Sequence, residues 1–321
     1  MSPGISHGSE RKGMKVSIIG GGGRVGSDAA FALQLGGIVR EIALVDMNKD
    51  LADGEALDLR HGASLCASQT FTSSNEYDIV AGSDCVVITA GLRRKPDESR
   101  LELINRNVGL FKGILDSLKG VKLNVGATIL VVSNPVDILT QLAATSGIVP
   151  ESQVLGLGTV LDTCRFRSLL ADHFNVGARD VHALILGEHG DSMVPILSSA
   201  TIGGVPLASI AGYTPEAVQG VFEFTRKSGA EVIRLKGGAG RAVGVSIKEV
   251  VETIALNTEA VLPVSSVQHG KLGISDISLS LPTKVGRRGA HEVLEPAVSD
   301  AEREGLMKSA KSLKDVLSQL G

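Results

Sequence analysis

Residues 15–26 read Lys-Val-Ser-Ile-Ile-Gly-Gly-Gly-Gly-Arg-Val-Gly, and this stretch decides the fold. Its aliphatic first half is typical of a buried strand, and residues 24–33 have the spacing of a helix. A glycine turn between a strand and a helix predicts a dinucleotide-binding turn, because glycines let the backbone approach a pyrophosphate at the helix N-terminus. An ordinary glycine-rich turn is the alternative.

The glycine block fits the dinucleotide pattern in two registers. Gly21-x-Gly23-x-x-Gly26 and Gly20-x-x-Gly23-x-x-Gly26 match equally well. In this turn we expect the cofactor to be contacted by Gly20, Gly21, Gly23, Arg24, Val25 and Gly26.

The next aliphatic run, residues 41–46, ends in an acid. Asp46 stands 20 residues beyond Gly26, where a carboxylate can accept hydrogen bonds from an adenosine ribose. No arginine adjoins Asp46 to hold a 2′-phosphate, so the sequence favours NAD over NADP. Taken alone, Asp46 could equally cap a turn at the end of a strand.

Two further runs, residues 84–91 and 127–135, are almost continuously apolar. Such runs are typical of strands buried on both faces of a parallel sheet, and a helical pattern at 101–118 lies between them. The sequence therefore predicts an α/β fold with a doubly wound (Rossmann) parallel sheet, whose strands end at the ligand. The strand-end residues expected to contact the cofactor are Thr89, Gly91, Val132, Ser133 and Asn134. Asn-Pro is also a common turn starter, which is a structural alternative for Asn134.

The composition excludes several classes of partner. The 321 residues carry a formal charge of −3, which gives no reason to expect nucleic acid or an anionic membrane. No apolar run is long enough to span a bilayer, and residues 1–13 lack the apolar core of a secretory signal. Cys66, Cys85 and Cys164 have no metal-ligand or redox spacing, so we expect a cytoplasmic protein without a metal site.

The pattern divides the chain into segments. Residues 1–13 are predicted to be a disordered extension, 14–154 the nucleotide-binding domain, and 155–321 an α+β domain for substrate, catalysis and oligomer contacts. Three amphipathic stretches in the last segment are expected to be helices, namely 215–235, 245–262 and 299–320, the last starting from a capping box of Ser299 and Glu302. The stretch 245–262 is a candidate contact between subunits, although a buried internal helix would look the same.

One histidine stands where catalytic side chains are often presented. His189 follows the apolar run 181–187 and a glycine, and an imidazole can both give and take a proton near neutral pH. Asp162 and Arg165, three residues apart, would share one helix face. Both observations have a plainer interpretation. His189 could be a hydrogen-bonded histidine in a turn, and Asp162 with Arg165 could form a surface salt bridge.

Seven segments, in order, resemble the lactate/malate dehydrogenases, most closely the lactate-dehydrogenase-like malate dehydrogenases. These segments are 54–59, 88–91, 98–107, 133–137, 161–167, 187–192 and 273–282. The resemblance implies an NAD-dependent oxidoreductase that forms a homo-oligomer, a tetramer or a dimer.

The resemblance also implies roles for individual side chains. His189 would be the acid/base, Asp162 would orient and charge-stabilise its imidazole, and Arg165 would clamp the substrate's C1 carboxylate. Arg100 would polarise the substrate carbonyl, Asn134 would bind the substrate or the nicotinamide, and Asn107 would contact the cofactor.

The loop 91–100 bears on the choice of substrate. Arg94, six residues before Arg100, stands where the family's malate enzymes carry arginine and its lactate enzymes typically glutamine. A second substrate carboxylate left unpaired in a closed site would cost roughly 3–5 kcal/mol, which Arg94 would avoid. Ala239, where lactate enzymes tend to have threonine, favours the same choice, whereas Glu188 is more lactate-like.

The expected function is therefore a malate dehydrogenase of the tricarboxylic acid cycle, which interconverts the dicarboxylates oxaloacetate and (S)-malate. An L-lactate dehydrogenase is the alternative within the family. A hydrolase using Ser192 or Ser133 with His189 would lack the Gly-x-Ser-x-Gly elbow, and a non-catalytic NAD sensor would leave the polar cluster unexplained.

Overall fold

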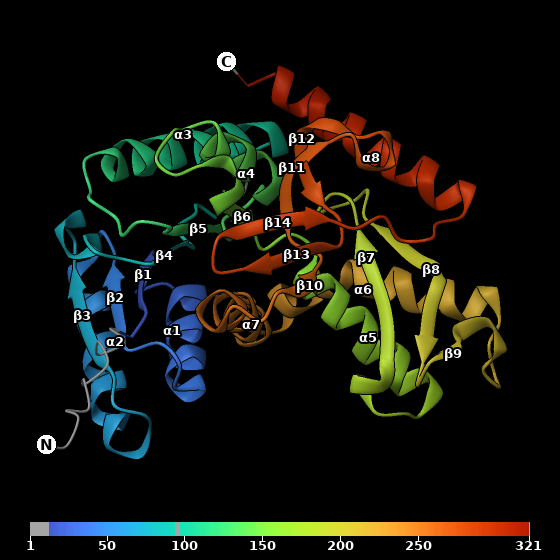
Figure 1. Cartoon of the computed structure of the whole chain (residues 1–321), viewed down its shortest axis with the longest axis horizontal. Helices are drawn as coiled ribbons and strands as arrows, with labels where there is room; N and C mark the ends of the chain where they lie inside the picture. Colours follow the sequence, from blue (N-terminus) through green and yellow to red (C-terminus); the bar gives the residue numbers. More distant parts are fainter. Residues whose placement is uncertain (1–12, 94–96, 321) are drawn as a thin grey trace, which may run out of the picture.

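The computed structural model describes residues 13–93 and 97–320. The predicted extension 1–13 therefore lies, apart from Gly13, outside the described residues. Figure 1 shows β1, β2 and β3 with α1 and α2 at one end of the molecule, and β7, β8 and β9 with α5 and α6 at the other. Helix α7 and the strands β10, β13 and β14 lie between the two ends.

The helices occupy the following ranges: α1 Arg24–Gly36, α2 Lys49–Gly62, α3 Arg100–Lys119, α4 Val136–Ala144, α5 Val160–Phe174, α6 Pro215–Lys236, α7 Arg241–Leu256 and α8 Asp300–Ser318. The strands are β1 Lys15–Ile19, β2 Glu41–Val45, β3 Thr70–Ser74, β4 Cys85–Ile88, β5 Thr128–Val131, β6 Val154–Gly156, β7 Val181–Leu186, β8 Val194–Ile202, β9 Val205–Pro206, β10 Ala260–Leu262, β11 Ser265–His269, β12 Ser275–Ser280, β13 Thr283–Gly286 and β14 Gly289–Val293.

The main sheet has the strand order β12-β11-β6-β5-β4-β1-β2-β3. Strands β1 to β6 pair in parallel, and the chain order reverses direction beside β1, which confirms the predicted doubly wound sheet. Strands β11 and β12 add to this sheet in antiparallel fashion, an extension that the sequence analysis did not predict. The predicted boundary at residue 154 falls at the first residue of β6.

Both faces of the sheet are covered by helices. Every residue of β4 and β5 is buried, as the near-continuous apolar runs predict. One face packs against α3, α4 and α8 in one apolar core, and the other packs against α1, α2 and α7 in a second core. A third core joins α5 and α6 to the small sheet of β7, β8 and β9.

The end of β7 is tied to the main sheet. Gly187 and Ser280 exchange both backbone hydrogen bonds, with N–O distances of 2.9 and 3.0 Å. This bridge carries the segment after β7, which includes His189, to the edge of the sheet where the parallel strands end.

The predicted helical stretch 245–262 is confirmed as far as Leu256 and is wrong beyond it. Helix α7 ends at Leu256, because Asn257 adopts a left-handed conformation (φ 53°) that closes the helix, and the chain then turns into β10. The start of α8 is as predicted, since Ser299 and Glu302 form a capping box. None of the helices in residues 13–93 and 97–320 has the length and apolar character needed to cross a membrane.

Candidate active site

The glycine turn after β1 has no room for side chains. A Cβ on Gly20, whose φ is +86°, would lie 2.7 Å from the Ala90 backbone nitrogen, and one on Gly26 would lie 2.3 Å from the Gly20 carbonyl oxygen. Gly23 caps α1 without a side-chain hydrogen bond, so the first backbone N–H groups of this helix remain available to a ligand. This is the cradle that a pyrophosphate requires, and the residues present fit NAD.

Asp46 lies beside that turn. Its Oδ2 accepts a hydrogen bond from the Gly22 N–H at 3.1 Å, and its Oδ1 accepts one from the Asn48 N–H at 3.0 Å. Each carboxylate oxygen keeps a further lone pair, which a ribose hydroxyl could use.

The strand-end residues are brought to the same edge. The Thr89 hydroxyl donates to the carbonyl oxygens of Ile19 and Gly20, at 3.0 and 3.2 Å. The Ser133 hydroxyl donates to the carbonyl oxygens of Ile88 and Ala90. Along this edge Val25 and Val132 are partly buried, and Gly91 lies next to the Asn107 amide.

Two predicted cofactor contacts have other partners here. The Arg24 guanidinium donates to the carbonyl oxygens of Lys236 and Gly238, each at 2.9 Å, and so joins the glycine turn to the segment between α6 and α7. The buried Asn107 amide accepts from the Leu92 N–H at 2.8 Å and donates to the Leu92 carbonyl. Both side chains therefore support loops beside the cradle.

A histidine, an aspartate and an arginine meet between α5 and the end of β7. His189 Nδ1 lies 2.5 Å from Asp162 Oδ2, and Arg165 Nη1 lies 3.0 Å from Asp162 Oδ1. Asp162 is 1% exposed and His189 is 24% exposed, so the pair Asp162–Arg165 is not the surface salt bridge of the alternative interpretation. Within the described residues His189 Nε2 has no hydrogen-bond partner, which leaves it available to a substrate.

The electrostatics of this cluster favour a charged imidazole. The negative charge of Asp162 raises the pKa of His189 from 6.5 to about 9, against the opposing effects of burial and of Arg165. Burial would raise the pKa of Asp162, but the charges of His189 and Arg165 outweigh it and hold that pKa below its usual range. The arrangement can store a proton on His189 and give it to a ligand atom.

Sequence reasoning missed a second carboxylate next to His189. Asp137, in the first turn of α4, is 2% exposed, and its Oδ2 accepts a hydrogen bond from the His189 backbone N–H at 2.8 Å. The only signal in the sequence is the acid in Asn-Pro-Val-Asp (134–137), two residues after a proline at a strand end.

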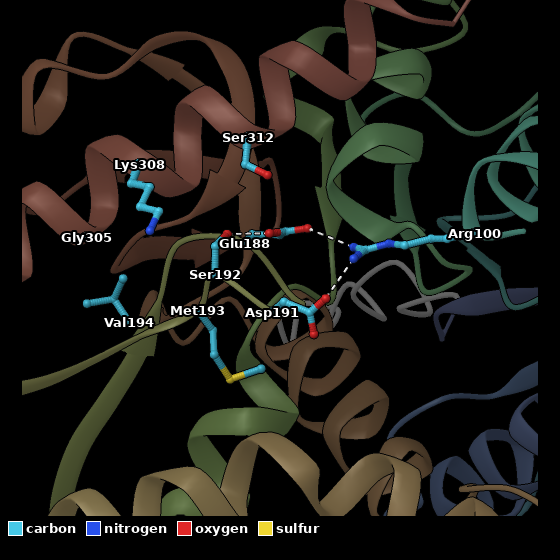
Figure 2. Close-up of a pocket in the computed structure, with 9 residues that line it drawn as sticks. All are labelled: Arg100, Glu188, Asp191, Ser192, Met193, Val194, Gly305, Lys308 and Ser312. Carbon is cyan, nitrogen blue, oxygen red and sulfur yellow. Dashed lines mark hydrogen bonds and ion pairs between the residues drawn. The ribbon is translucent and has the colours of Figure 1, made fainter.

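Arg100 reaches the loop that carries His189 but has acidic partners there. It begins α3, and its guanidinium lies 2.7 Å from Asp191 and 3.7 Å from Glu188. Arg100 is one of the side chains that line a pocket of about 360 Å³. Figure 2 shows this side chain reaching toward Glu188 and Asp191, on the side away from Lys308 and Val194. The pocket is lined by Arg100, Glu188, Asp191, Ser192, Met193, Val194, Gly305, Lys308 and Ser312, so it lies beside the His189 cluster rather than on it.

The remaining candidates have mixed positions. Asn134 is exposed at the start of α4, and its Oδ1 accepts from the Val136 N–H at 3.3 Å. Arg94 lies outside the described residues, whereas Ala239 is partly buried against the core that includes α7. Across the described ranges no three metal-ligating side chains form a group that could hold an ion.

The serine hydroxyls do not support a hydrolase. Ser192 donates to Glu188 and lies 3.2 Å from the Ser309 hydroxyl, and Ser133 donates to backbone carbonyls. Neither has a hydrogen bond to His189 among residues 13–93 and 97–320, so neither is held as the activated nucleophile of a hydrolase.

A Rossmann cradle beside a carboxylate–histidine pair defines the class of nicotinamide-dependent oxidoreductases. Two family models identify the family within this class. Residues 14–156 match the lactate/malate dehydrogenase NAD binding domain, and residues 159–320 match the lactate/malate dehydrogenase alpha/beta C-terminal domain. The chain belongs to the lactate/malate dehydrogenase family, and its cofactor is NAD.

Similar proteins cover nearly the whole chain. The L-lactate dehydrogenase 1 of Clostridium acetobutylicum is 41% identical over 315 residues, 97% of this chain and 99% of the relative. The L-lactate dehydrogenase of Kosmotoga olearia is 40% identical over 314 residues, 96% of each chain. The ligand-bound crystal structure of the minor L-lactate dehydrogenase from Enterococcus mundtii superposes with a TM-score of 0.92 at 33% identity, covering 96% of this chain and 99% of that one.

These relatives overturn the prediction of a malate dehydrogenase, and with it the dicarboxylate substrate and the place in the tricarboxylic acid cycle. The prediction depended chiefly on Arg94. That residue stands between two further cations, Arg93 and Lys95. A cation in a cation-rich loop can be solvated by water, so its presence does not by itself require a second substrate carboxylate.

Proposed function

We propose that this chain is an NAD-dependent L-lactate dehydrogenase, which reversibly reduces pyruvate to (S)-lactate. The observation that carries the proposal is the cluster of His189, Asp162 and Arg165, with a buried carboxylate between an imidazole and a guanidinium. The names of the relatives, all L-lactate dehydrogenases, support pyruvate as the oxo acid.

Each side chain of the cluster has a task in this reaction. Bound NADH supplies the hydride. His189 gives the proton from Nε2 to the carbonyl oxygen, while Asp162 holds Nδ1–H and stabilises the imidazolium. Arg165 pairs with the substrate carboxylate, for which a planar guanidinium provides two parallel donors.

Arg100 has to exchange partners to act on the carbonyl. Its contact with Asp191 joins two exposed side chains (63% and 81% exposed), and such pairs contribute only about 0–1 kcal/mol. Release of the guanidinium from Asp191 therefore costs little. We propose that Arg100 makes this exchange when the oxo acid binds, and then stabilises the developing alkoxide.

The organisation of the protein forms part of the proposal. We assign NAD binding to residues 14–154 and substrate binding to 155–321, and we expect a homo-oligomer. Exposed apolar side chains on α1 and α7, which pack against each other, favour association: Phe31, Leu35 and Val245. The cysteines Cys66, Cys85 and Cys164 are all free, which is compatible with the proposed cytoplasmic location.

The test is NADH oxidation, followed by absorbance, with pyruvate and with oxaloacetate as separate substrates. We expect kcat/KM to be higher with pyruvate. A higher value with oxaloacetate would overturn the proposal. Tight NADH binding with no turnover of either acid would favour the sensor alternative.

A further inference from the structure

Asp137 is a buried acid that takes no direct part in the proposed proton and hydride transfer. It lies in the first turn of α4, directly after Asn134 at the cofactor edge, and it is 2% exposed. Its carboxylate accepts the backbone N–H of His189, from a segment 52 residues away in the chain. Asp137 thus joins the start of α4 to the loop that carries His189.

The carboxylate is only partly satisfied by this contact. Oδ2 has the 2.8 Å hydrogen bond from His189, but Oδ1 has no hydrogen-bond partner within the part of the chain that the structure describes. The buried Ser265 hydroxyl lies beside Asp137 and lowers the pKa of this carboxyl as a hydrogen-bonding neighbour, but the geometry falls short of a full hydrogen bond. A half-satisfied buried carboxylate is costly to the folded state, so packing alone gives no reason for an acid here.

A neutral residue could accept the same backbone hydrogen bond without the cost of a buried charge. Asparagine has the shape of aspartate and a carbonyl oxygen that accepts an N–H. What asparagine lacks is the negative charge, and this charge favours the protonated form of the His189 imidazole.

We propose that Asp137 is a positioning residue for proton transfer: its bond to the His189 backbone fixes where the imidazole stands, and its buried charge favours the imidazolium. The inference rests on the proposed function, because it assigns the proton to His189. Asp162 touches the ring directly, whereas Asp137 acts through the main chain and through space.

The charged groups around His189 come from three elements. Helix α5 supplies Asp162 and Arg165, helix α4 supplies Asp137, and the His189 loop itself supplies Glu188. Asp162 and Asp137 both raise the pKa of His189 and Arg165 lowers it. Burial raises the pKa of Asp137 to about 6, so this carboxyl is mostly ionised at neutral pH and above.

The first experiment is the pH profile of pyruvate reduction by Asp137→Asn. Removal of this buried negative charge, which raises the pKa of His189, is expected to move the alkaline limb of kcat/KM down by about one pH unit. NADH affinity is expected to stay unchanged. Asp84→Asn is the matched control, since Asp84 also accepts a backbone N–H (Lys15, 2.8 Å) but at the opposite end of the strands.

A second experiment needs neither turnover nor a variant that folds. The amide proton of His189 in the wild-type protein is followed by NMR as a function of pH. Because this N–H bonds to Asp137, its chemical shift is expected to show one step near pH 6 and a separate step near pH 9, where the imidazole titrates.

The outcomes separate the two proposals. A shifted profile in Asp137→Asn together with the step near pH 6 supports the inference. An Asp137→Asn profile that superimposes on that of the wild type, or an amide that does not respond near pH 6, would overturn it. Absence of pyruvate turnover together with both amide steps would remove the proposed function and leave the placement of Asp137 beside His189 intact.

Discussion

The contact between His189 and Asp162 determines the chemistry that the site can perform. A carboxylate that is 1% exposed is little solvated by water, so its charge acts strongly on the imidazole 2.5 Å away, although Arg165 offsets part of it. The histidine is therefore charged over most of the physiological range. Such a group is suited to give a proton to a carbonyl oxygen that accepts a hydride.

The two directions of the reaction should have opposite pH dependences. Reduction of pyruvate needs imidazolium, so kcat/KM is expected to stay level below about pH 9 and to fall above it, following the pKa of His189. Oxidation of lactate needs the neutral ring and should rise through the same pH. Initial rates in both directions between pH 6 and pH 10.5 check this, and a reduction limb near 6.5 would show that Asp162 does not shift the imidazole.

A lysine in place of Arg165 tests whether substrate binding needs only a positive charge there or also the planar pair of donors of a guanidinium. Arg165→Lys keeps a cation next to Asp162 but loses the planar pair of donors, so KM for pyruvate is expected to rise by about tenfold or more with a smaller change in kcat. Steady-state kinetics at saturating NADH measure the split. A change confined to kcat would mean that Arg165 does not hold the substrate carboxylate.

Some residues of the candidate site could be predicted from the sequence, and others could not. His189, Asp162 and Arg165 follow from short ordered motifs, and the structure brings them together. Asp137 could not be predicted, because its partner is a backbone N–H 52 residues away that no side-chain pattern records. Arg100 has two partners, Asp191 and Glu188, and these could not be predicted either. They lie about 90 residues away in the chain and meet Arg100 only when α3 packs beside the His189 loop.

Secondary-structure elements were predictable where the signal is local. The strand, the glycine turn and α1 lie adjacent in the chain, and Ser299 with Glu302 marks the start of α8. An identical capping box of Ser99 and Glu102 begins α3 and could have been found from the same spacing. The end of α7 was missed because asparagine (Asn257), rather than the commoner glycine, takes the left-handed position that closes the helix.

The glycine turn gives a prediction at the level of an element. Gly26→Ala would place a Cβ 2.3 Å from the Gly20 carbonyl oxygen, which forces the turn and α1 apart. We expect NADH affinity to fall by at least tenfold and the melting temperature to drop. Gly113→Ala in α3 is the control, because its Cβ would have nothing within 4 Å and should stabilise the helix by about 0.5–1 kcal/mol.

Fluorescence titration with NADH measures the affinity of both variants, and thermal unfolding measures their melting temperatures. Unchanged NADH affinity in Gly26→Ala would show that the cradle does not depend on the close approach of α1 to the turn.

The whole molecule is organised around one sheet that both halves of the chain build. The parallel strands β1, β2, β4 and β5 were predicted from their apolar runs, whereas β3 and β6 were not, and β11 and β12 come from residues more than 100 positions later and join by antiparallel pairing. Their pairing depends on contacts that form only in the folded chain, such as the bridge between Gly187 and Ser280. That long-range bridge also brings the His189 loop to the cofactor edge.

The raised pKa of His189 should make the free energy of unfolding of the whole protein depend on pH. His189 has a folded-state pKa of about 9, above its ordinary 6.5, so its stabilising contribution is complete below pH 6.5 and is lost as pH rises through 9. We expect the free energy of unfolding to fall between pH 6.5 and pH 9.5, by on the order of 1–3 kcal/mol. Urea denaturation of wild type and His189→Asn over this range measures it; equal slopes in the two proteins would contradict the assignment.

The most direct test of the proposed reaction is turnover of pyruvate by His189→Asn at saturating NADH, with NADH affinity measured on the same sample. Because asparagine cannot give a proton, we predict unchanged NADH binding and a loss of kcat on the order of 10²–10⁴-fold. Retention of near wild-type turnover would contradict the account, since the proton would then come from another group.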